Sequence, residues 1–347
     1  PPRSTLFPYT TLFRSLVAGF LVKNPAARLV ALCDLWEDKV EQAKRQIPVE
    51  APALYTDYQR LLASDVDAVI IGTPVFLHPE HFEAAVQAGK HIYIEKPAAP
   101  DVAGSKRMMR AAGMAGAKQN IAFGFQARYG PGYRKAKALL DAGAIGPVQM
   151  AHGHFIKGDV SGAAGPVPRP ATLEEKIRGW KPWRDLSGDV IVETYCHGID
   201  VLNWFLGGHA THAYGTGGRT VQRYGDNMDH VDVTFTYPGG IHVPFTGSQI
   251  TARFYRSAEE QFFGAKGTLV TSRQYWTHHR GARDVVTETI PEDITRNAID
   301  EFVARIRSGK PENTGVRSAE STLTAIMARM AIELKREVSW DEVLRAG

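Results

Sequence analysis

The sequence predicts an α/β protein in which a doubly wound parallel-sheet domain precedes an α+β domain whose sheet is mostly antiparallel. Apolar strands alternate with helices between residues 16 and 125, which is the pattern of βαβ units. Residues 230–245 instead alternate between apolar and polar side chains, as half-exposed antiparallel strands do. The 347 residues suffice for two cores. We therefore expect domains at 1–125 and 126–347.

The first domain is expected to consist of short apolar strands that are each followed by a helix. Continuous apolar runs, typical of strands covered on both faces, place strands at 29–33, 68–71, 91–94 and 120–125. Apolar residues at helical spacing place helices at 16–23, 36–47, 82–89 and 101–115. Gly89 is the expected C-terminal cap of the third of these helices.

The order and type of the predicted elements change after residue 125, where the second domain begins. Strands are expected at 148–156, 230–245, 260–263 and 267–271. Helices are expected at 131–143, 190–206, 297–307 and 317–335. A Pro-Gly-Gly sequence divides the run 230–245, and it predicts a hairpin turn there.

Composition excludes several classes of protein. The net charge is +4 and the basic residues are spread along the chain, which indicates a solvated surface and no nucleic-acid partner. The two cysteines, Cys33 and Cys196, form no C-x-x-C motif, which argues against a disulfide framework or a structural zinc site. No run of 18 apolar residues predicts a membrane span. We expect a cytoplasmic protein, with export left open.

Residues 1–15, PPRSTLFPYTTLFRS, differ in character from the rest of the chain. They contain no glycine, repeat the triplet TLF and lack the apolar core of a signal peptide. We expect this segment to be foreign to the gene, such as translated adapter or cloning sequence. A G-x-G-x-x-G phosphate loop would lie just before Leu16 and is missing, and Gly19 stands alone inside a predicted helix.

Asp34 directly follows the apolar run 29–33. In a dinucleotide-binding βαβ unit, an acid at the tip of the second strand accepts hydrogen bonds from the ribose hydroxyls and repels a 2′-phosphate, so NAD is favoured over NADP. The alternative is a solvated loop residue or the N-cap of the following helix. Spacing alone does not separate these two interpretations.

Gly72, Thr73 and Pro74 predict a tight turn at the carboxyl end of the strand 68–71. Ligands of open parallel sheets bind in the crevice at this end, so the turn is a candidate cofactor contact. The alternative is an ordinary strand-to-helix loop, with Pro79 at the first helical position.

Glu95, Lys96 and Pro97 end the next strand at the same edge. The proline disfavours helix at Lys96 and keeps that residue extended. A cation at this edge can hydrogen-bond a substrate hydroxyl and stabilise a developing alkoxide. The simpler alternative is a surface lysine paired with Glu95.

Glu193 and His197 are four residues apart on a predicted helix and would share one face, with Asp200 three residues further on. A histidine of near-neutral pKa suits proton abstraction from a secondary alcohol, and Glu193 could orient it or pair with Lys96. The alternative is a core histidine with satisfied hydrogen bonds. A metal site is the weaker interpretation, because no third ligand has supporting spacing.

Three stretches together resemble the glucose–fructose oxidoreductase / inositol dehydrogenase (Gfo/Idh/MocA) family. They are GTPVFLHPEHFEAAVQAGKHIYIEKP, the helix that carries Glu193, His197, Asp200 and Trp204, and the closing SGKPENTGVRSAESTLTAIMARMAIELKREVSW. The resemblance runs from about residue 16 to the end. It implies an N-terminal Rossmann domain and a C-terminal domain with a large open sheet, through which a dimer or tetramer would form. It also implies bound NAD, with NADP less favoured, and chemistry on a hydroxyl of a sugar, polyol or related compound.

The resemblance also implies roles for individual residues. Lys96 matches the family lysine and His197 the catalytic histidine, while Glu193 and Tyr195 stand where the family usually has Asp and Gly. The expected cofactor contacts are Asp34, Gly72, Thr73, Pro74, His78, Glu95 and Lys96. From position, the expected substrate contacts are Arg128, Tyr129, Trp180, Arg184 and Asp200.

Two alternatives to a net dehydrogenase stay open. The same scaffold can use NAD as a recycled oxidant, so that a transient 3-keto sugar permits cleavage of a glycosidic bond. The missing glycine loop could also leave a family member that is defective in catalysis.

Overall fold

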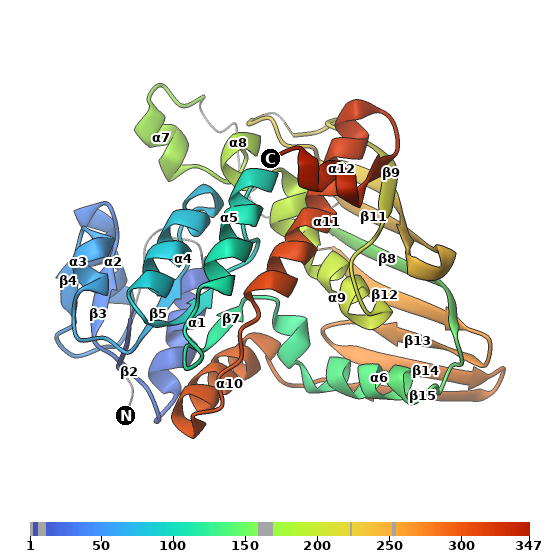
Figure 1. Cartoon of the computed structure of the whole chain (residues 1–347), viewed down its shortest axis with the longest axis horizontal. Helices are drawn as coiled ribbons and strands as arrows, with labels where there is room; N and C mark the ends of the chain where they lie inside the picture. Colours follow the sequence, from blue (N-terminus) through green and yellow to red (C-terminus); the bar gives the residue numbers. More distant parts are fainter. Residues whose placement is uncertain (1–2, 6–11, 159–168, 223, 252–254) are drawn as a thin grey trace. The chain divides into compact units, whose positions relative to one another are not determined.

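The computed structural model describes residues 3–5, 12–158, 169–222, 224–251 and 255–347 (Figure 1). Internal contacts divide the chain into two compact units. The first comprises Pro1–Ala99, Gly104–Gln126 and Thr295–Ala319, and the second Pro100–Ala103, Ala127–Ile294 and Glu320–Gly347. Residues 295–319 thus pack with the first unit, although the sequence placed them in the second domain. The domain boundaries themselves stay a prediction.

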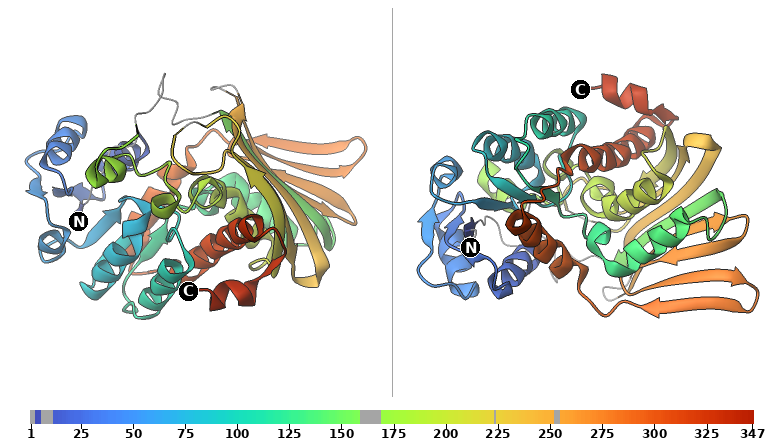
Figure 2. Two further views of the ribbon diagram at one scale, coloured as in Figure 1. Left: turned by 90° about the horizontal axis from the view of Figure 1, so that it is seen from above. Right: turned by 60° about the horizontal axis from the view of Figure 1, so that its bottom comes forward.

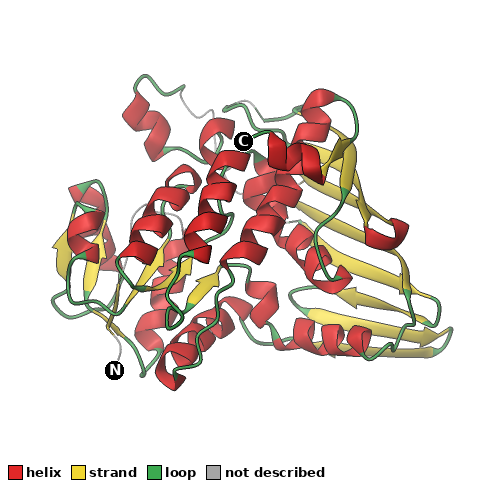
Figure 3. Cartoon of the chain, viewed as in Figure 1, coloured by secondary structure: helices red, strands yellow, loops and turns green. Residues whose placement is uncertain are grey.

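The first unit contains a five-stranded, fully parallel sheet (Figure 3). Its strands, in spatial order, are β2 (Arg28–Leu29), β1 (Arg3–Thr5), β5 (Ala68–Ile71), β6 (His91–Ile94) and β7 (Ile121–Phe123). A separate parallel pair consists of β3 (Ala31–Cys33) and β4 (Ala53–Tyr55). The strand expected at 29–33 is therefore divided at Val30. The parallel, doubly wound character predicted for this part of the chain is confirmed.

Strand β1 belongs to the segment that the sequence marked as foreign. Its Ser4 is paired with Leu29 of β2 and with Ala68 of β5, so β1 lies between the two. The predicted position of the missing glycine loop falls partly on residues 6–11, which lie outside the described residues. The described part of the chain therefore contains a strand at the first-strand position of this sheet.

Helices of the first unit follow its strands in the predicted alternation. They are α1 (Leu12–Lys23), α2 (Glu37–Gln46), α3 (Tyr58–Leu62), η1 (Val75–Leu77), α4 (His78–Gln87), most of α5 (Val102–Gly113) and α10 (Ile294–Ser308). Gly89 has φ +70°, a conformation that favours glycine, and its amide donates to the Val86 carbonyl at 3.0 Å after the end of α4. Phe302 of α10 packs edge-on against Tyr93 of β6, with ring centroids 5.8 Å apart, which explains why α10 belongs to this unit.

The second unit is built on a nine-stranded sheet in which only β8 and β11 are parallel neighbours. The spatial order is β15 (Asp284–Thr289), β14 (Tyr275–Gly281), β13 (Gly267–Thr271), β12 (Arg256–Gly264), β8 (Val148–Gly158), β11 (Ile241–Thr251), β10 (His230–Tyr237), β9 (His212–Gly218) and β16 (Val338–Ser339). Helices α6 (Pro131–Asp141) and α9 (Cys196–Leu206) lie over one face of this sheet (Figure 2). Phe205 of α9 stacks on Phe262 of β12 at 4.6 Å. The large, mostly antiparallel sheet is confirmed.

The hairpin predicted at 230–245 is present. Strands β10 and β11 pair from Tyr237↔Ile241 outward, across the Pro238–Gly240 turn (η4). Val231, Val233, Phe235 and Tyr237 are all buried, while the intervening side chains are partly or fully exposed, so the alternation identified the covered face.

The helix predicted at 190–206 differs at its start. It begins with a π-helical turn, η3 (Ile191–Tyr195), and continues as α9. The remaining helices are η2 (Gln126–Tyr129), α7 (Leu173–Arg178), α8 (Arg184–Ser187), α11 (Gly315–Leu334), which both units share, and α12 (Trp340–Arg345). Among the described residues, no helix combines the length and apolar character that crossing a membrane requires.

Candidate active site

In the first unit, the predicted cofactor residues follow the carboxyl ends of parallel strands. Asp34 follows β3, Gly72–Pro74 follow β5, and Glu95 and Lys96 follow β6. Carboxyl ends of parallel strands form the ligand-binding edge of an open α/β sheet.

Asp34 is buried, with 2% of its surface exposed, so it is not a solvated loop residue. Its Oδ1 accepts a hydrogen bond from the Trp36 amide at 3.0 Å. Burial and the neighbouring Asp34 and Asp57 raise the pKa of Cys33 to about 12, so this thiol stays protonated. Asp34 presents a carboxylate, the acceptor type that ribose hydroxyls require.

His78 connects the loops that follow β5 and β6. Its ring is buried, with Nδ1 2.7 Å from the Pro97 carbonyl oxygen and Nε2 2.9 Å from the Thr73 carbonyl oxygen. Because Pro97 directly follows Lys96, the ring holds the Lys96 loop against the Gly72–Pro74 turn. The cofactor contact expected of His78 stays a prediction.

Glu95 and Lys96 differ in exposure. Glu95 is buried and Lys96 is half-buried, which does not fit a simple surface pair. The Glu95 carboxylate lies against Gly124, where an added Cβ would come within 2.5 Å of Oε2. Glycine at position 124 therefore leaves the space that this carboxylate occupies. These carboxylate, backbone and ammonium groups fit the donor and acceptor pattern of a dinucleotide, and Asp34, Gly72–Pro74 and Lys96 are the residues that would hold it.

In the second unit, Glu193 lies in the π-helical turn and is 9% exposed. Its Oε2 accepts a hydrogen bond from Thr194 Oγ1 at 2.6 Å and lies 3.4 Å from Lys181 Nζ. His197 is half-buried in the first turn of α9. The helix predicted to carry Glu193 and His197 is present, but its first turn is π-helical and only the part from Cys196 on is an α-helix. That the two side chains share one face stays a prediction.

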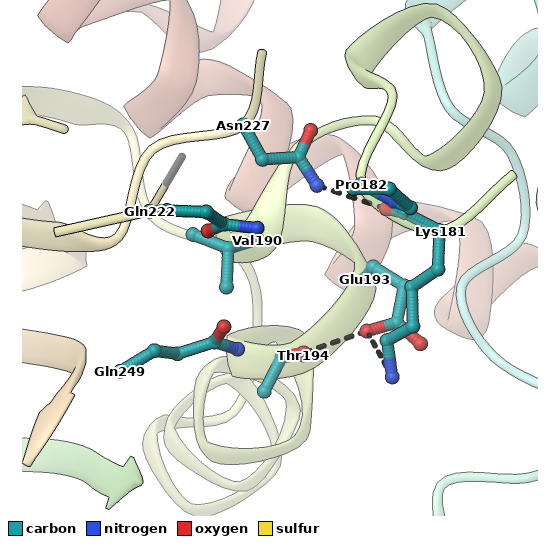
Figure 4. Close-up of a pocket in the computed structure, with 8 residues that line it drawn as sticks. All are labelled: Lys181, Pro182, Val190, Glu193, Thr194, Gln222, Asn227 and Gln249. Atoms are coloured by element: carbon teal, nitrogen blue, oxygen red, sulfur yellow. Dashed lines mark hydrogen bonds and ion pairs between the residues drawn. The ribbon is translucent and has the colours of Figure 1, made fainter. Parts of the chain in front are cut away.

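A small, partly open pocket lies beside Glu193 (Figure 4). Its lining comes from four separate segments, and six of its eight residues carry polar side chains. The lining residues are Lys181, Pro182, Val190, Glu193, Thr194, Gln222, Asn227 and Gln249. Hydroxyl, amide, ammonium and carboxylate groups together suit a ligand rich in hydroxyl groups.

Two left-handed residues precede the π-helical turn. Gly188 has φ +84° and Asp189 φ +78°. The buried Asp189 carboxylate accepts from the amides of Val190 at 2.6 Å and Met228 at 3.0 Å, and pairs with Arg184 Nε at 3.0 Å. Burial raises the pKa of Asp189, and these hydrogen bonds and charges oppose the rise. A left-handed conformation is unfavourable for a residue with a side chain, and the hydrogen bonds and ion pair of Asp189 hold it in this conformation directly before the turn that carries Glu193.

The predicted substrate residues have partners of their own. Arg128 donates to Asp200 from Nε and from one terminal nitrogen at 2.9–3.1 Å, and Ser321 donates to the same buried carboxylate at 2.7 Å. Arg184 pairs with Asp189 and Glu333. None of the five predicted residues Arg128, Tyr129, Trp180, Arg184 and Asp200 lines this pocket, and their substrate roles stay predictions.

Tyr195, which the resemblance places where the family usually has glycine, does not line this pocket. Its fully buried ring lies over Gly247 of β11, where an added Cβ would come within 2.2 Å of Cε2. Phe155 and Phe245 flank it, with ring centroids at 5.8 and 6.3 Å. The ring therefore fills the layer between the π-helical turn and the sheet.

Sequence reasoning missed most of the pocket. Glu193 was identified, whereas Lys181, Gln222, Asn227 and Gln249 were not. One residue of the pocket could have been found from the sequence. Gln249 follows Val243 and Phe245 at the spacing of one strand face, so it is a polar side chain on the face that those two residues mark as buried. The described residues contain no cluster of three or more His, Cys, Asp or Glu side chains placed to hold a metal ion.

Comparison with known proteins gives matches to both halves of the chain. Residues 12–123 match the family described as "Oxidoreductase family, NAD-binding Rossmann fold", and residues 133–270 match the "GFO/IDH/MocA C-terminal domain". The inositol 2-dehydrogenase of Salmonella typhimurium is 32% identical over 179 residues, which are 51% of this chain and 46% of that protein. The scyllo-inositol 2-dehydrogenase (NAD(+)) of Bacillus subtilis is 29% identical over 82% of this chain and 80% of its own length.

Solved structures share the fold. A myo-inositol 2-dehydrogenase from Lactobacillus plantarum has a TM-score of 0.77 at 22% identity, covering 98% of this chain and 99% of that one. A levoglucosan dehydrogenase in complex with NADH and levoglucosan has a TM-score of 0.83 at 17% identity, covering 97% and 98%. The chain spans about half the length of several curated relatives that it matches. With both domain types matched in order along one chain, this protein belongs to the Gfo/Idh/MocA oxidoreductase family.

Proposed function

We propose that the chain is an NAD-dependent oxidoreductase that transfers a hydride between the nicotinamide cofactor and a secondary hydroxyl of a sugar, polyol or inositol-like substrate. The observation that carries this proposal is the pocket beside Glu193, whose lining is rich in groups that bind hydroxyls, in a chain matched to this family over both halves. The names of the relatives, inositol and levoglucosan dehydrogenases, support substrates of this type and favour net oxidation over the two alternatives.

The roles proposed for the chain's residues follow from their chemistry. His197 accepts the proton of the substrate hydroxyl, because a near-neutral imidazole is suited to this transfer. The Lys96 ammonium donates a hydrogen bond to the same oxygen and stabilises the charge that develops on it. Asp34 accepts hydrogen bonds from the adenosine ribose, and its negative charge disfavours NADP. The bound cofactor supplies the hydride acceptor.

The test is NADH formation by the full chain with NAD⁺ and a panel of myo-inositol, scyllo-inositol, levoglucosan and glucose. We expect at least one of them to yield a ketone and NADH in equal amounts. A cleaved glycoside without NADH would instead identify the recycling lyase, and no product from any polyol would contradict the proposal.

The first prediction concerns Lys96 and His197. Lys96→Ala and His197→Ala should each lower kcat by about 10²–10⁴-fold, the usual contribution of an acid–base or oxyanion-stabilising group. Lys118→Ala, an exposed lysine that precedes the amino end of β7, is the matched control and should retain wild-type turnover. A wild-type kcat in Lys96→Ala would show that Lys96 takes no part in the reaction.

We also propose that a second copy of the chain covers the open face of the nine-stranded sheet. Met150, Tyr214 and Ile250 are apolar or aromatic, lie on the face opposite α9, and are 41–52% exposed. Sedimentation equilibrium should show a dimer or tetramer, and Ile250→Glu should dissociate it. A monomer at micromolar concentration would contradict this assembly.

A further inference from the structure

Gln249 occupies an unusual position for a polar side chain. On β11 the covered face carries Val243, Phe245, Gly247 and Gln249, all of them buried. Gln249 is only 9% exposed, and no described residue forms a hydrogen bond with its side-chain amide, although its backbone amide donates to the Asp229 carbonyl at 2.8 Å. Because Gln249 lines the pocket, its amide is available to a group that enters the pocket.

The pocket lies where this amide points. In Figure 4 the Gln249 side chain extends toward Thr194 and the Glu193 carboxylate across the pocket. The primary amide offers both a donor and an acceptor, which is the combination that a hydroxyl group satisfies in either orientation. A substrate hydroxyl in this pocket would therefore supply the partner that the protein does not.

The charge of the pocket lining is balanced. Among the described lining residues, Lys181 is the one cation, and it lies 3.4 Å from the Glu193 carboxylate. The other polar side chains of this lining are the amides of Gln222, Asn227 and Gln249 and the hydroxyl of Thr194. A ligand that carries its own carboxylate would have to displace Glu193 from Lys181 and would then lie close to a like charge. Like charges at such distances in a partly buried site are unfavourable.

We propose that Gln249 is a specificity-determining residue that hydrogen-bonds a hydroxyl of the substrate, and that the Lys181–Glu193 ion pair makes the pocket select an uncharged polyol over the corresponding sugar acid. This inference rests on the proposed function and names which members of its substrate class the pocket takes.

The first experiment compares Gln249→Leu with the wild-type full chain. With a neutral polyol, kcat/KM should fall about 10–100-fold, while the Kd for NAD⁺ stays unchanged, because the lost group contacts substrate only. Gln261→Leu is the matched control: the same substitution in the same sheet, at a half-exposed position of β12 between the buried Glu260 and Phe262. It should leave kcat/KM within about twofold of wild type.

Gln249→Glu keeps the size and one acceptor but removes the amide donor, and it decides the question if Gln249→Leu does not fold. We expect it to retain NAD⁺ binding and lose at least about tenfold in kcat/KM. A Gln249→Glu or Gln249→Leu variant that folds and keeps wild-type kcat/KM would overturn the role of Gln249.

The second experiment tests the ion pair with glucose and glucuronate, which differ by one carboxylate. The quantity measured is the ratio of kcat/KM for the acid to kcat/KM for the neutral sugar, in which any common effect of Glu193 on the chemical step cancels. Wild type should favour glucose, and Glu193→Gln, which leaves Lys181 unpaired, should raise the ratio at least about tenfold. An unchanged ratio, or a wild-type preference for glucuronate, would overturn the inference.

Calorimetric binding of the same two sugars separates this inference from the proposed function. If wild type forms no NADH with any polyol, the proposed function fails, yet the two Kd values in wild type and Glu193→Gln still show whether the pocket discriminates by charge. A shift of the Kd ratio toward glucuronate in Glu193→Gln supports the inference, and no shift contradicts it.

Discussion

At the scale of single residues, Glu260 is a buried carboxyl on the covered face of β12. It is 4% exposed and its Oε2 accepts a hydrogen bond from Thr271 Oγ1 at 2.8 Å. Burial raises its pKa to about 8, with Glu259 and Asp200 adding to the rise and the Thr271 hydrogen bond opposing it. At neutral pH the folded protein therefore keeps a proton that the unfolded chain, with a pKa near 4.5, releases.

This difference sets the pH dependence expected from Glu260. The folded state binds the Glu260 proton more tightly than the unfolded state does. The contribution of Glu260 to the free energy of unfolding therefore falls as pH rises from about 4.5 to about 8, and it then levels off. Glu260→Gln should flatten this slope, and at about pH 9 it should be more stable than wild type by roughly 1–3 kcal/mol. Urea unfolding across pH measures it, with the exposed Glu288→Gln as control, and parallel curves for wild type and Glu260→Gln would contradict it.

Tyr195 gives a second prediction at this scale. Its ring fills the layer over Gly247, so Tyr195→Ala should leave a cavity and lower the free energy of unfolding by about 3–5 kcal/mol. The matched control is Tyr255→Ala, because Tyr255 is 55% exposed and its removal should change little. Chemical denaturation of both variants is the measurement. A Tyr195→Ala variant as stable as the control would show that the ring is not a packing element.

At the scale of elements, Asp229 fixes the connection between β9 and β10. Its Oδ2 accepts from the backbone amides of Thr220, Val221 and Gln222 at 2.8–3.0 Å. Burial alone would raise the pKa of Asp229, but these hydrogen bonds and that of His230 outweigh it and lower the pKa to about 2. Gln222 lines the pocket, so this carboxylate positions one wall of the candidate active site.

Asp229→Asn should loosen that connection. It should cost about 1–3 kcal/mol of stability, speed limited proteolysis near Gln222 and raise KM several-fold. In wild type, the contribution of Asp229 is fully present above about pH 3.8 and is lost as pH falls toward about 2, because the folded pKa lies below the unfolded one. Asp232→Asn, at an exposed position of β10, is the control. Equal proteolysis rates in the two variants would contradict the anchoring role.

The bounds of a helix or strand could be predicted from the sequence where a single local feature, such as a continuous apolar run, determines them. The strands 68–71 and 91–94 were located to the residue, because continuous apolar runs end there at a turn or at a proline. Strand β1 was not predicted, since its three residues Arg3–Thr5 are polar and carry no hydrophobic pattern. The π-helical turn was also missed, because its onset depends on the left-handed Gly188 and Asp189 and on the tertiary partners of Asp189.

At the scale of the whole molecule, the order of the two domain types was readable from the change of hydrophobic period after residue 125. The pocket was not, apart from Glu193. Tertiary folding brings its lining together from segments near residues 181, 190, 222 and 249. The hydrophobic pattern within any one segment does not indicate that these segments meet. The return of residues 295–319 to the first unit likewise depends on contacts such as Tyr93 with Phe302, which are distant in sequence.

The proposed reaction requires a dinucleotide to bind a chain whose first fifteen residues contain no glycine. The most direct test is calorimetric binding of NAD⁺ and NADP⁺ to the full chain and to Asp34→Ala. We expect NAD⁺ to bind at least about tenfold more tightly than NADP⁺, and Asp34→Ala to lose that preference, because Asp34 accepts from the ribose hydroxyls and repels a 2′-phosphate. No binding of NAD⁺, or equal affinity for both nucleotides in the wild-type chain, would contradict an NAD-dependent oxidoreductase.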